Sequence, residues 1–138
     1  MSDGAVLDAS AALAWFFEDE LDDLARAMAR SVATSGALVP TLFRLEVQNA
    51  LLQAVRRKRL TRAVVEARFD DLDRLKLTVD AAEAGAAFKT GFALAERFDL
   101  SAYDAAYLEL AVRAKRPLMT RDDRLRDAAR TMQLLWES

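Results

Sequence analysis

Cysteine and histidine are both absent from the 138 residues of this chain. Without cysteine there is no disulfide, thiol nucleophile or thiolate metal site, which is usual for proteins of a reducing cytoplasm. Without histidine there is no imidazole to act as general base, to activate a serine or to bind zinc. Any metal ion must therefore be bound by oxygen ligands, and carboxylates become the first candidates for catalysis.

Glycine, proline and long hydrophobic runs are also scarce. The chain has four glycines and two prolines, with no linker-like stretch or fixed-period repeat, and 53% of its residues are hydrophobic. This length and composition predict one domain over residues 1–138. The longest apolar run, residues 9–17, is too short to cross about 30 Å of hydrocarbon, and no targeting segment is visible. We therefore expect a cytoplasmic protein that does not enter the membrane.

Neither sign of charge dominates the chain. Twenty-two acidic and twenty basic residues give a formal net charge of −2. This balance excludes a globally basic nucleic-acid binder but permits a local basic patch.

Short apolar runs alternate with longer amphipathic segments. Strands are predicted at residues 4–7, 37–39, 77–79, 117–120 and 133–135. Helices are predicted at residues 10–17, 21–34, 42–57, 61–74, 81–97, 102–115 and 123–131. Strands separated by helices favour parallel pairing with right-handed crossovers. The expected fold is α/β, a three-layer α/β/α sandwich whose central, mostly parallel sheet has four to five strands.

Four carboxylates are expected at the carboxyl edge of this sheet, where ligands of such folds bind. They are Asp8, Glu46, Asp104 and Asp122. Each also has a structural explanation, because the three aspartates stand at helix starts, where acids cap, and Glu46 fits a solvated helix position. Together, clustered carboxylates without histidine are what Mg²⁺ or Mn²⁺ prefers. Such a cation supports phosphodiester hydrolysis without any imidazole.

The segments around these acids resemble the PIN domain, and within it the VapC-type ribonuclease toxins. The resemblance lies in residues 6–13, 45–51, 101–111 and 118–125, in the family's order and at roughly its spacing. It implies a Mg²⁺- or Mn²⁺-dependent endoribonuclease whose catalytic and metal-binding acids match the same four residues. We expect Asp8 and Asp104 to be the principal ligands, with Glu46 and Asp122 completing the cluster or orienting the attacking water.

Several neighbours are candidates for supporting roles. Ser10 and the Thr120-Arg121-Asp122 segment match the family's polar positions, and the two hydroxyls are suited to bonding carboxylates, water or phosphate, or to capping. Asn49 falls on the same helix face as Glu46. Asp123 is a second acid beside Asp122 and an alternative partner for the Arg121 side chain.

Five cations are candidates for RNA binding. They are Arg121, beside the acidic cluster, and the run Arg56, Arg57, Lys58 and Arg59. Basic clusters attract a phosphate backbone. The run also fits a solvated helix end, where cations favour the helix dipole.

The resemblance further implies RNA as substrate, a cognate antitoxin as partner, and a homodimer or a hetero-oligomer with that antitoxin. Trp15, Phe16 and Phe17 are core candidates, or an apolar groove for a partner helix if that face is exposed. The alternative function is a non-catalytic PIN-like module that binds RNA or protein. A haloacid-dehalogenase-type phosphotransferase is disfavoured because Ser10 stands where that chemistry needs a second aspartate. A nucleotide-binding domain is disfavoured because the glycines are too few and misplaced.

Overall fold

Four short apolar strands form the central sheet of the computed structural model, which describes residues 4–81 and 86–138. The strands are β1 (Ala5–Leu7), β2 (Ala37–Val39), β3 (Leu77–Val79) and β4 (Leu118–Met119). Their order is β3-β2-β1-β4, and every neighbouring pair is parallel. All of β1 is buried, as suits a central strand, whereas Val79 on the edge strand β3 is 56% exposed.

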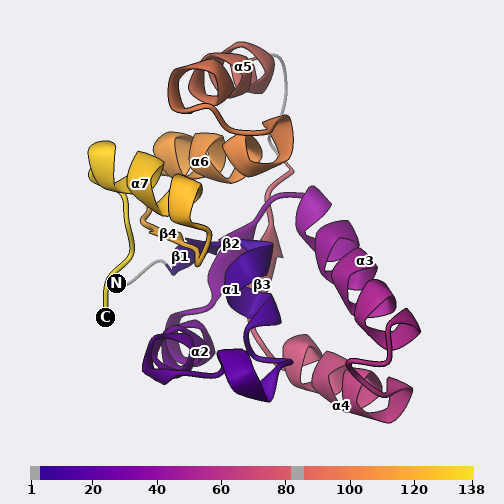
Figure 1. Cartoon of the computed structure of the whole chain (residues 1–138). Coiled ribbons are helices and arrows are strands. Elements are labelled where there is room, and N and C mark those ends of the chain that lie inside the picture. Colours follow the sequence, from indigo (N-terminus) through magenta and orange to yellow (C-terminus); the bar gives the residue numbers. More distant parts are fainter. Residues whose placement is uncertain (1–3, 82–85) are drawn as a thin grey trace.

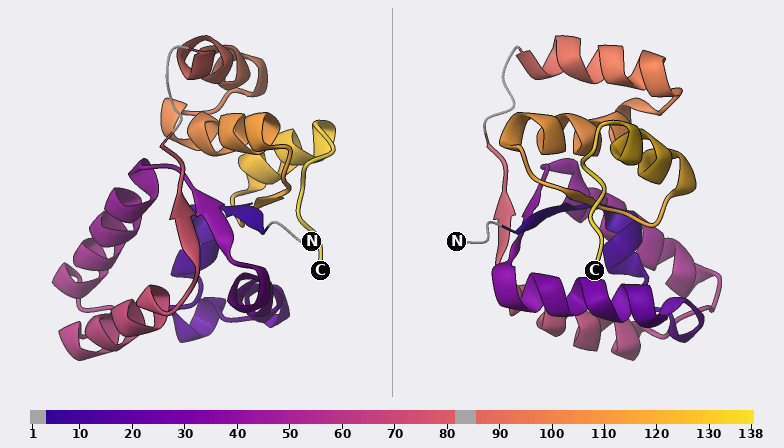
Figure 2. Two further views of the ribbon diagram at one scale, coloured as in Figure 1. Left: turned by 180° about the vertical axis from the view of Figure 1, so that it is seen from behind. Right: turned by 90° about the vertical axis from the view of Figure 1, so that its left-hand side faces the viewer.

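Helices connect the strands and cover both faces of the sheet (Figure 1). They are α1 (Ala9–Leu13), α2 (Asp23–Ser35), α3 (Leu42–Arg56), α4 (Arg62–Asp73), α5 (Ala86–Phe98), α6 (Ala102–Ala114) and α7 (Asp123–Thr131), with a 3₁₀ turn, η1, at Glu18–Glu20. Helices α6 and α7 lie on one side and α1 and α2 on the other, while α5 is stacked outside α6 (Figure 2). The α/β sandwich predicted from the sequence is confirmed.

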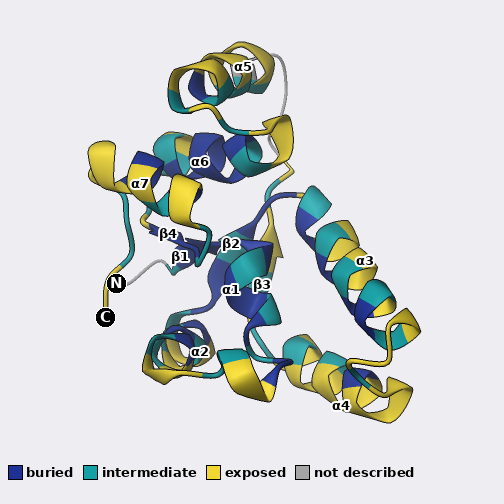
Figure 3. Ribbon diagram, in the orientation of Figure 1, coloured by how far each residue is buried: buried dark blue, intermediate teal, exposed yellow. Residues whose placement is uncertain are grey.

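The hydrophobic core lies between the sheet and its two helical layers (Figure 3). Leu7 and Leu118 of neighbouring strands are fully buried, and so are Met28 on α2 and Tyr107 and Leu108 on α6. Burial of such side chains is worth about 1.5–3 kcal/mol each relative to exposure. This packing fixes the strand ends from which the functional candidates project.

Two glycines let the first strands begin close together. Gly36 ends α2 in the left-handed region, with φ 72°, and a Cβ there would lie 2.7 Å from the carbonyl oxygen of Lys76. A Cβ on Gly4 would lie 2.3 Å from the carbonyl oxygen of Gly36. Larger residues would push β1, β2 and the segment before β3 apart.

Three predicted elements differ from the structure. The helix predicted at 10–17 ends at Leu13, because Trp15 and Phe16 donate backbone bonds to residues three positions earlier, a tighter turn that buries both Phe16 and Phe17. The fifth strand predicted at 133–135 is only a single parallel bridge between Leu118 and Leu135. The helix predicted at 81–97 begins at Ala86 in the described chain, and residues 82–85 lie outside the described part.

Among the described residues, no helix combines the length and the apolar character that a membrane span requires.

Candidate metal centre

The carboxyl ends of β1 and β4 lie side by side and bring two distant sequence segments together. Leu7 pairs with Met119, and the backbone N–H of Asp8 donates to the carbonyl oxygen of Met119 at 3.0 Å. The residues that follow these strands, Asp8 and Thr120, are therefore neighbours although 112 positions separate them. The parallel pairing places the first candidate acid at this sheet edge.

Asp8 is 4% exposed, and two hydroxyl groups hold its carboxylate. Its Oδ2 accepts hydrogen bonds from Ser10 Oγ at 2.5 Å and from Thr120 Oγ1 at 2.7 Å. Asp8 precedes α1 but makes no side-chain cap to that helix. Burial raises the pKa of Asp8, the two hydroxyls oppose this rise, and the charges of Asp104 and Asp122 add to it.

Thr120 is fully buried and links Asp8 to Asp122. While its hydroxyl donates to Asp8, it accepts from the backbone N–H of Asp122 at 3.1 Å. Ser10 Oγ lies 3.2 Å from Thr120 Oγ1 and accepts from the backbone N–H of Arg121 at 3.0 Å. Ser10 and Thr120 therefore orient the Asp8 carboxylate, while their part in function stays a prediction.

Glu46 reaches the same edge from α3 and is partly buried. Its Oε1 accepts a 2.6 Å hydrogen bond from the hydroxyl group of Tyr107 on α6. Burial raises the pKa of Glu46, the Tyr107 hydroxyl opposes the rise, and Asp8 and Asp104 add to it through charge repulsion. Glu46 is therefore not the solvated helix residue that the sequence also allowed.

Asp104 lies in the first turn of α6, whose N-cap is Ser101. The backbone N–H of Asp104 donates to Ser101 Oγ at 3.0 Å, so the serine hydroxyl satisfies one free donor of the helix start. Burial and then the charge of Asp122 raise the pKa of Asp104, and Ser101 opposes this rise. The cap thus fixes the position of the residue, and its carboxylate interacts electrostatically with the other acids.

Asp122 is both a helix cap and a member of the acidic group. Its Oδ2 accepts from the backbone N–H of Leu125 at 2.9 Å and so caps α7. Its charge also raises the pKa of Asp8 and of Asp104. The capping explanation is therefore correct for Asp122 and does not remove it from the cluster.

The four acids form one electrostatic group made only of oxygen donors. Asp8, Glu46 and Asp104 each have a raised pKa to which another member of the group contributes. Mutual repulsion of this kind is relieved by a hard divalent cation, and the donor set fits Mg²⁺ or Mn²⁺. As the side chains stand in residues 4–81 and 86–138, no three acids are drawn together tightly enough to hold an ion between them. The carboxylates therefore lie around a common site but do not enclose an ion.

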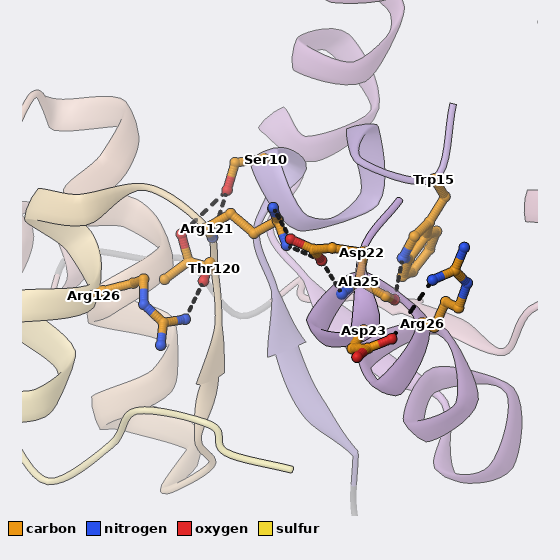
Figure 4. Close-up of polar contacts among 9 residues, drawn as sticks. All are labelled: Ser10, Trp15, Asp22, Asp23, Ala25, Arg26, Thr120, Arg121 and Arg126. Carbon is orange, nitrogen blue, oxygen red and sulfur yellow. Dashed lines mark hydrogen bonds and ion pairs between the residues drawn. The ribbon is translucent and has the colours of Figure 1, made fainter. Parts of the chain in front are cut away.

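Arg121 is paired with an acid that the sequence did not indicate. Its guanidinium donates to both carboxylate oxygens of Asp22, at 2.8 and 2.9 Å, instead of pairing with Asp123 (Figure 4). Asp22 also caps α2 through the backbone N–H of Ala25. The pair joins the loop after β4 to the start of α2. Arg126 supports that loop by donating to the carbonyl oxygen of Thr120 at 2.9 Å.

The other predicted site residues are exposed, and some of them line a surface groove. Asn49 and Asp123 are both exposed, and within the described chain neither side chain joins the hydrogen bonds around Asp8. The basic run is divided: Arg57 and Arg59 line a surface groove together with Ser10 and Asp122, whereas Arg56 and Lys58 do not line it. Phe16 and Phe17 are 5% and 9% exposed, so this aromatic group belongs to the core.

Sequence reasoning missed two polar features. The side chain of Tyr107 is fully buried, and its hydroxyl donates a hydrogen bond to Glu46. Near the end of β3, Arg113 pairs with the buried Glu109 and with Asp80. A local signal existed for Glu109 and Arg113, which are spaced i, i+4 on a helix. Because Arg113 offsets the charge of Asp80, this strand-end acid differs from the four acids of the cluster.

Comparison with known proteins agrees with this fold. A family model described as the PIN domain matches residues 5–131. The crystal structure of PAE2754 from Pyrobaculum aerophilum is similar to this chain with a TM-score of 0.68 and 21% identity, covering 93% of this chain and 86% of that one. At this identity the likeness concerns the fold, and no curated protein gives a significant match. Since the family model spans nearly the whole sequence, the chain belongs to the PIN domain family, whose members are generally nucleases that use divalent metal ions.

Proposed function

We propose that this protein is a Mg²⁺- or Mn²⁺-dependent endoribonuclease that hydrolyses phosphodiester bonds of RNA. The observation that supports this most directly is the group of four mutually repelling carboxylates at the carboxyl edge of the sheet, in a chain without histidine or cysteine. Unused like charges are costly to cluster, so their retention favours a bound cation. RNA as the substrate rests on the resemblance of the four acidic motifs to VapC-type ribonucleases.

Each carboxylate has a role in this proposal. Asp8, held by Ser10 and Thr120, and Asp104, placed by the α6 cap, would be the principal ligands. Glu46 and Asp122 would complete the cluster or orient the attacking water. A divalent cation held there supplies charge neutralisation at the scissile phosphate and lowers the pKa of water. The protein contributes a fixed arrangement of acids, which reduces the reorganisation needed during reaction.

The test is cleavage of a mixed-structure RNA pool by the purified protein with Mg²⁺, Mn²⁺ or EDTA. Asp8→Asn, Asp104→Asn and Asp122→Asn are assayed beside the parent, and Asp123→Asn serves as the control of equal charge change at an exposed position. We expect metal-dependent cleavage that the first three variants lose and the control keeps. RNA binding without metal-dependent turnover would instead support the non-catalytic module.

We also propose that the protein is the toxin of a toxin–antitoxin pair that acts on RNA in the cytoplasm and assembles as a homodimer or with its antitoxin. The VapC-like motifs support the toxin role. Large apolar side chains on α5 support a protein partner, since Phe88 and Phe92 are 86% and 69% exposed. Induced expression in a bacterial host should arrest growth, and Asp8→Asn should not. Normal growth with the folded parent protein would contradict the toxin role.

A further inference from the structure

A surface groove of about 510 Å³ extends from the acidic cluster to the basic run. Ser10 and Asp122 line it at the cluster, and Gln53 and Arg57 line it at the end of α3. The groove therefore joins two features that the sequence could only present separately: the candidate catalytic acids and a cation of the Arg56–Arg59 run. We call it the Arg57 groove.

Helical spacing on α3 and the turn after it place two residues of the basic run in the groove. Lys58 has φ 60°, in the left-handed region, and its backbone N–H donates to the carbonyl oxygen of Val55. The N–H of Arg59 then donates to the carbonyl oxygen of Ala54 at 2.8 Å, so the chain reverses at Lys58. The reversal brings Arg59 to the groove, and Arg57 lines it because it lies one helical turn after Gln53, whereas Arg56 and Lys58 do not line it.

Two of the three arginines that line the groove are already paired. Arg59 lies 3.5 Å from carboxylate oxygens of Asp19 and Glu20, and its guanidinium stacks on the Phe17 ring at 4.2 Å from the centroid. Arg121 makes its two bonds to Asp22. These contacts connect η1, α2 and α3 around the groove and use much of the charge of both arginines.

Arg57 is the cation of the groove whose charge is not offset in this way. Its side chain is exposed, and within residues 4–81 and 86–138 it forms no ion pair and no side-chain hydrogen bond. Gln53, one helical turn earlier, adds an amide donor on the same side of α3. An arginine with a free guanidinium beside an amide donor suits a phosphate group of a nucleic acid.

We propose that the Arg57 groove is a subsite for the RNA backbone next to the cleaved bond, with Arg57 binding a phosphate one or more nucleotides from the acidic cluster. This rests on the proposed nuclease function. The groove favours RNA over an acidic peptide because it opens directly onto Asp122 and Ser10, where the scissile phosphate must lie. The subsite helps to hold the strand and takes no part in the chemical step.

The first test measures binding in a background that does not cleave. Asp8→Asn protein, alone or with Arg57→Ala, is titrated into a fluorescent single-stranded RNA in EDTA, and the salt dependence of Kd is recorded. Arg56→Ala and Lys58→Ala are matched controls, because each removes one cation next to Arg57 but outside the groove. We expect Arg57→Ala to weaken binding about fivefold to tenfold and to reduce the salt slope by about 0.7, the value for one phosphate contact on a single strand. The controls should stay within about twofold.

The second test separates this subsite from the cleavage site. Arg57→Ala in the otherwise unchanged protein should raise the KM for an RNA oligomer with little change in kcat. It should leave hydrolysis of bis(4-nitrophenyl) phosphate unchanged, since that small diester does not extend into the groove. Arg57→Lys should recover part of the loss. A disturbed fold would lower both reactions and the Tm, and would show no recovery with lysine.

The outcomes distinguish the two proposals. Equal effects of Arg57→Ala and Arg56→Ala on RNA binding would overturn the subsite even if the parent protein cleaves RNA. Conversely, Arg57-dependent RNA binding without metal-dependent cleavage would support the groove and contradict the nuclease. If Arg57→Ala leaves RNA binding intact but prevents binding of an acidic peptide, the groove is a protein site and the proposal is wrong.

Discussion

The hydrogen bond between Tyr107 and Glu46 gives a sharp prediction. Tyr107→Phe removes one hydroxyl group from a fully buried side chain and leaves Glu46 Oε1 without its 2.6 Å donor. Hydrogen bonds to charged groups contribute about 1.5–3 kcal/mol. Glu46 is only partly buried, so water replaces some of the lost bond and the expected loss is about 1–1.5 kcal/mol. For a domain of this size that corresponds to a Tm lower by about 3–5 °C.

The pH dependence of this loss identifies its cause. The hydroxyl lowers the pKa of Glu46, so it favours the ionised carboxylate, although burial keeps that pKa above its usual 4.5. The stability contributed by the bond is therefore present at neutral pH and is lost as the pH falls through the raised pKa of Glu46 in the folded state.

Urea denaturation of metal-free protein between pH 4 and 8 measures the effect. Tyr103→Phe is the matched control, because Tyr103 lies one turn earlier on α6 and is 66% exposed. We expect a difference between Tyr107→Phe and the parent at pH 7 that shrinks toward pH 4, and no difference for Tyr103→Phe. A penalty that is equal at both pH values, or absent at pH 7, would refute the reasoning.

Four further predictions concern the surroundings of the site. Asp8→Asn should stabilise the metal-free protein at pH 7 by about 0.5–2 kcal/mol, because the raised pKa of Asp8 makes ionisation costly as the pH climbs above 3.8. A Tm at or below that of the parent at pH 7, or a gain that persists below pH 3.8, would oppose this. Millimolar Mg²⁺ should raise the Tm of the parent but hardly that of Asp8→Asn or Asp104→Asn, as differential scanning fluorimetry would show. Asp22→Asn keeps the α2 cap but breaks the ion pair with Arg121, so it should lower the Tm slightly in low salt and not in 1 M NaCl. Ser101→Ala should cost about 1 kcal/mol by removing the α6 cap, and denaturation of this variant beside Ser101→Asp, which keeps a capping oxygen, checks the cause.

Local signals in the amino-acid sequence predict most helices and strands of this protein. Continuous apolar runs predict β1 and β2, and amphipathic spacing with polar caps predicts α3 and α7 to within about one residue. Where local signals compete, the prediction was wrong: consecutive aromatic residues extend the apparent first helix to residue 17, but burying both Phe16 and Phe17 requires the tighter turn after Leu13.

The sequence also predicted which acids lie at the site, since residues that follow parallel strands share one edge of the sheet. It could not show which of them contact one another. Tyr107 and Glu46 are 61 positions apart, and Thr120 and Asp8 are 112 apart. Only the strand order β3-β2-β1-β4 places the end of β4 beside the end of β1. In the same way, only the packing of α3 beside α1 decides that Arg57 lines the groove with Asp122 while Arg56 does not. Local preferences act over one or two turns of chain, whereas these contacts depend on how whole helices and strands pack.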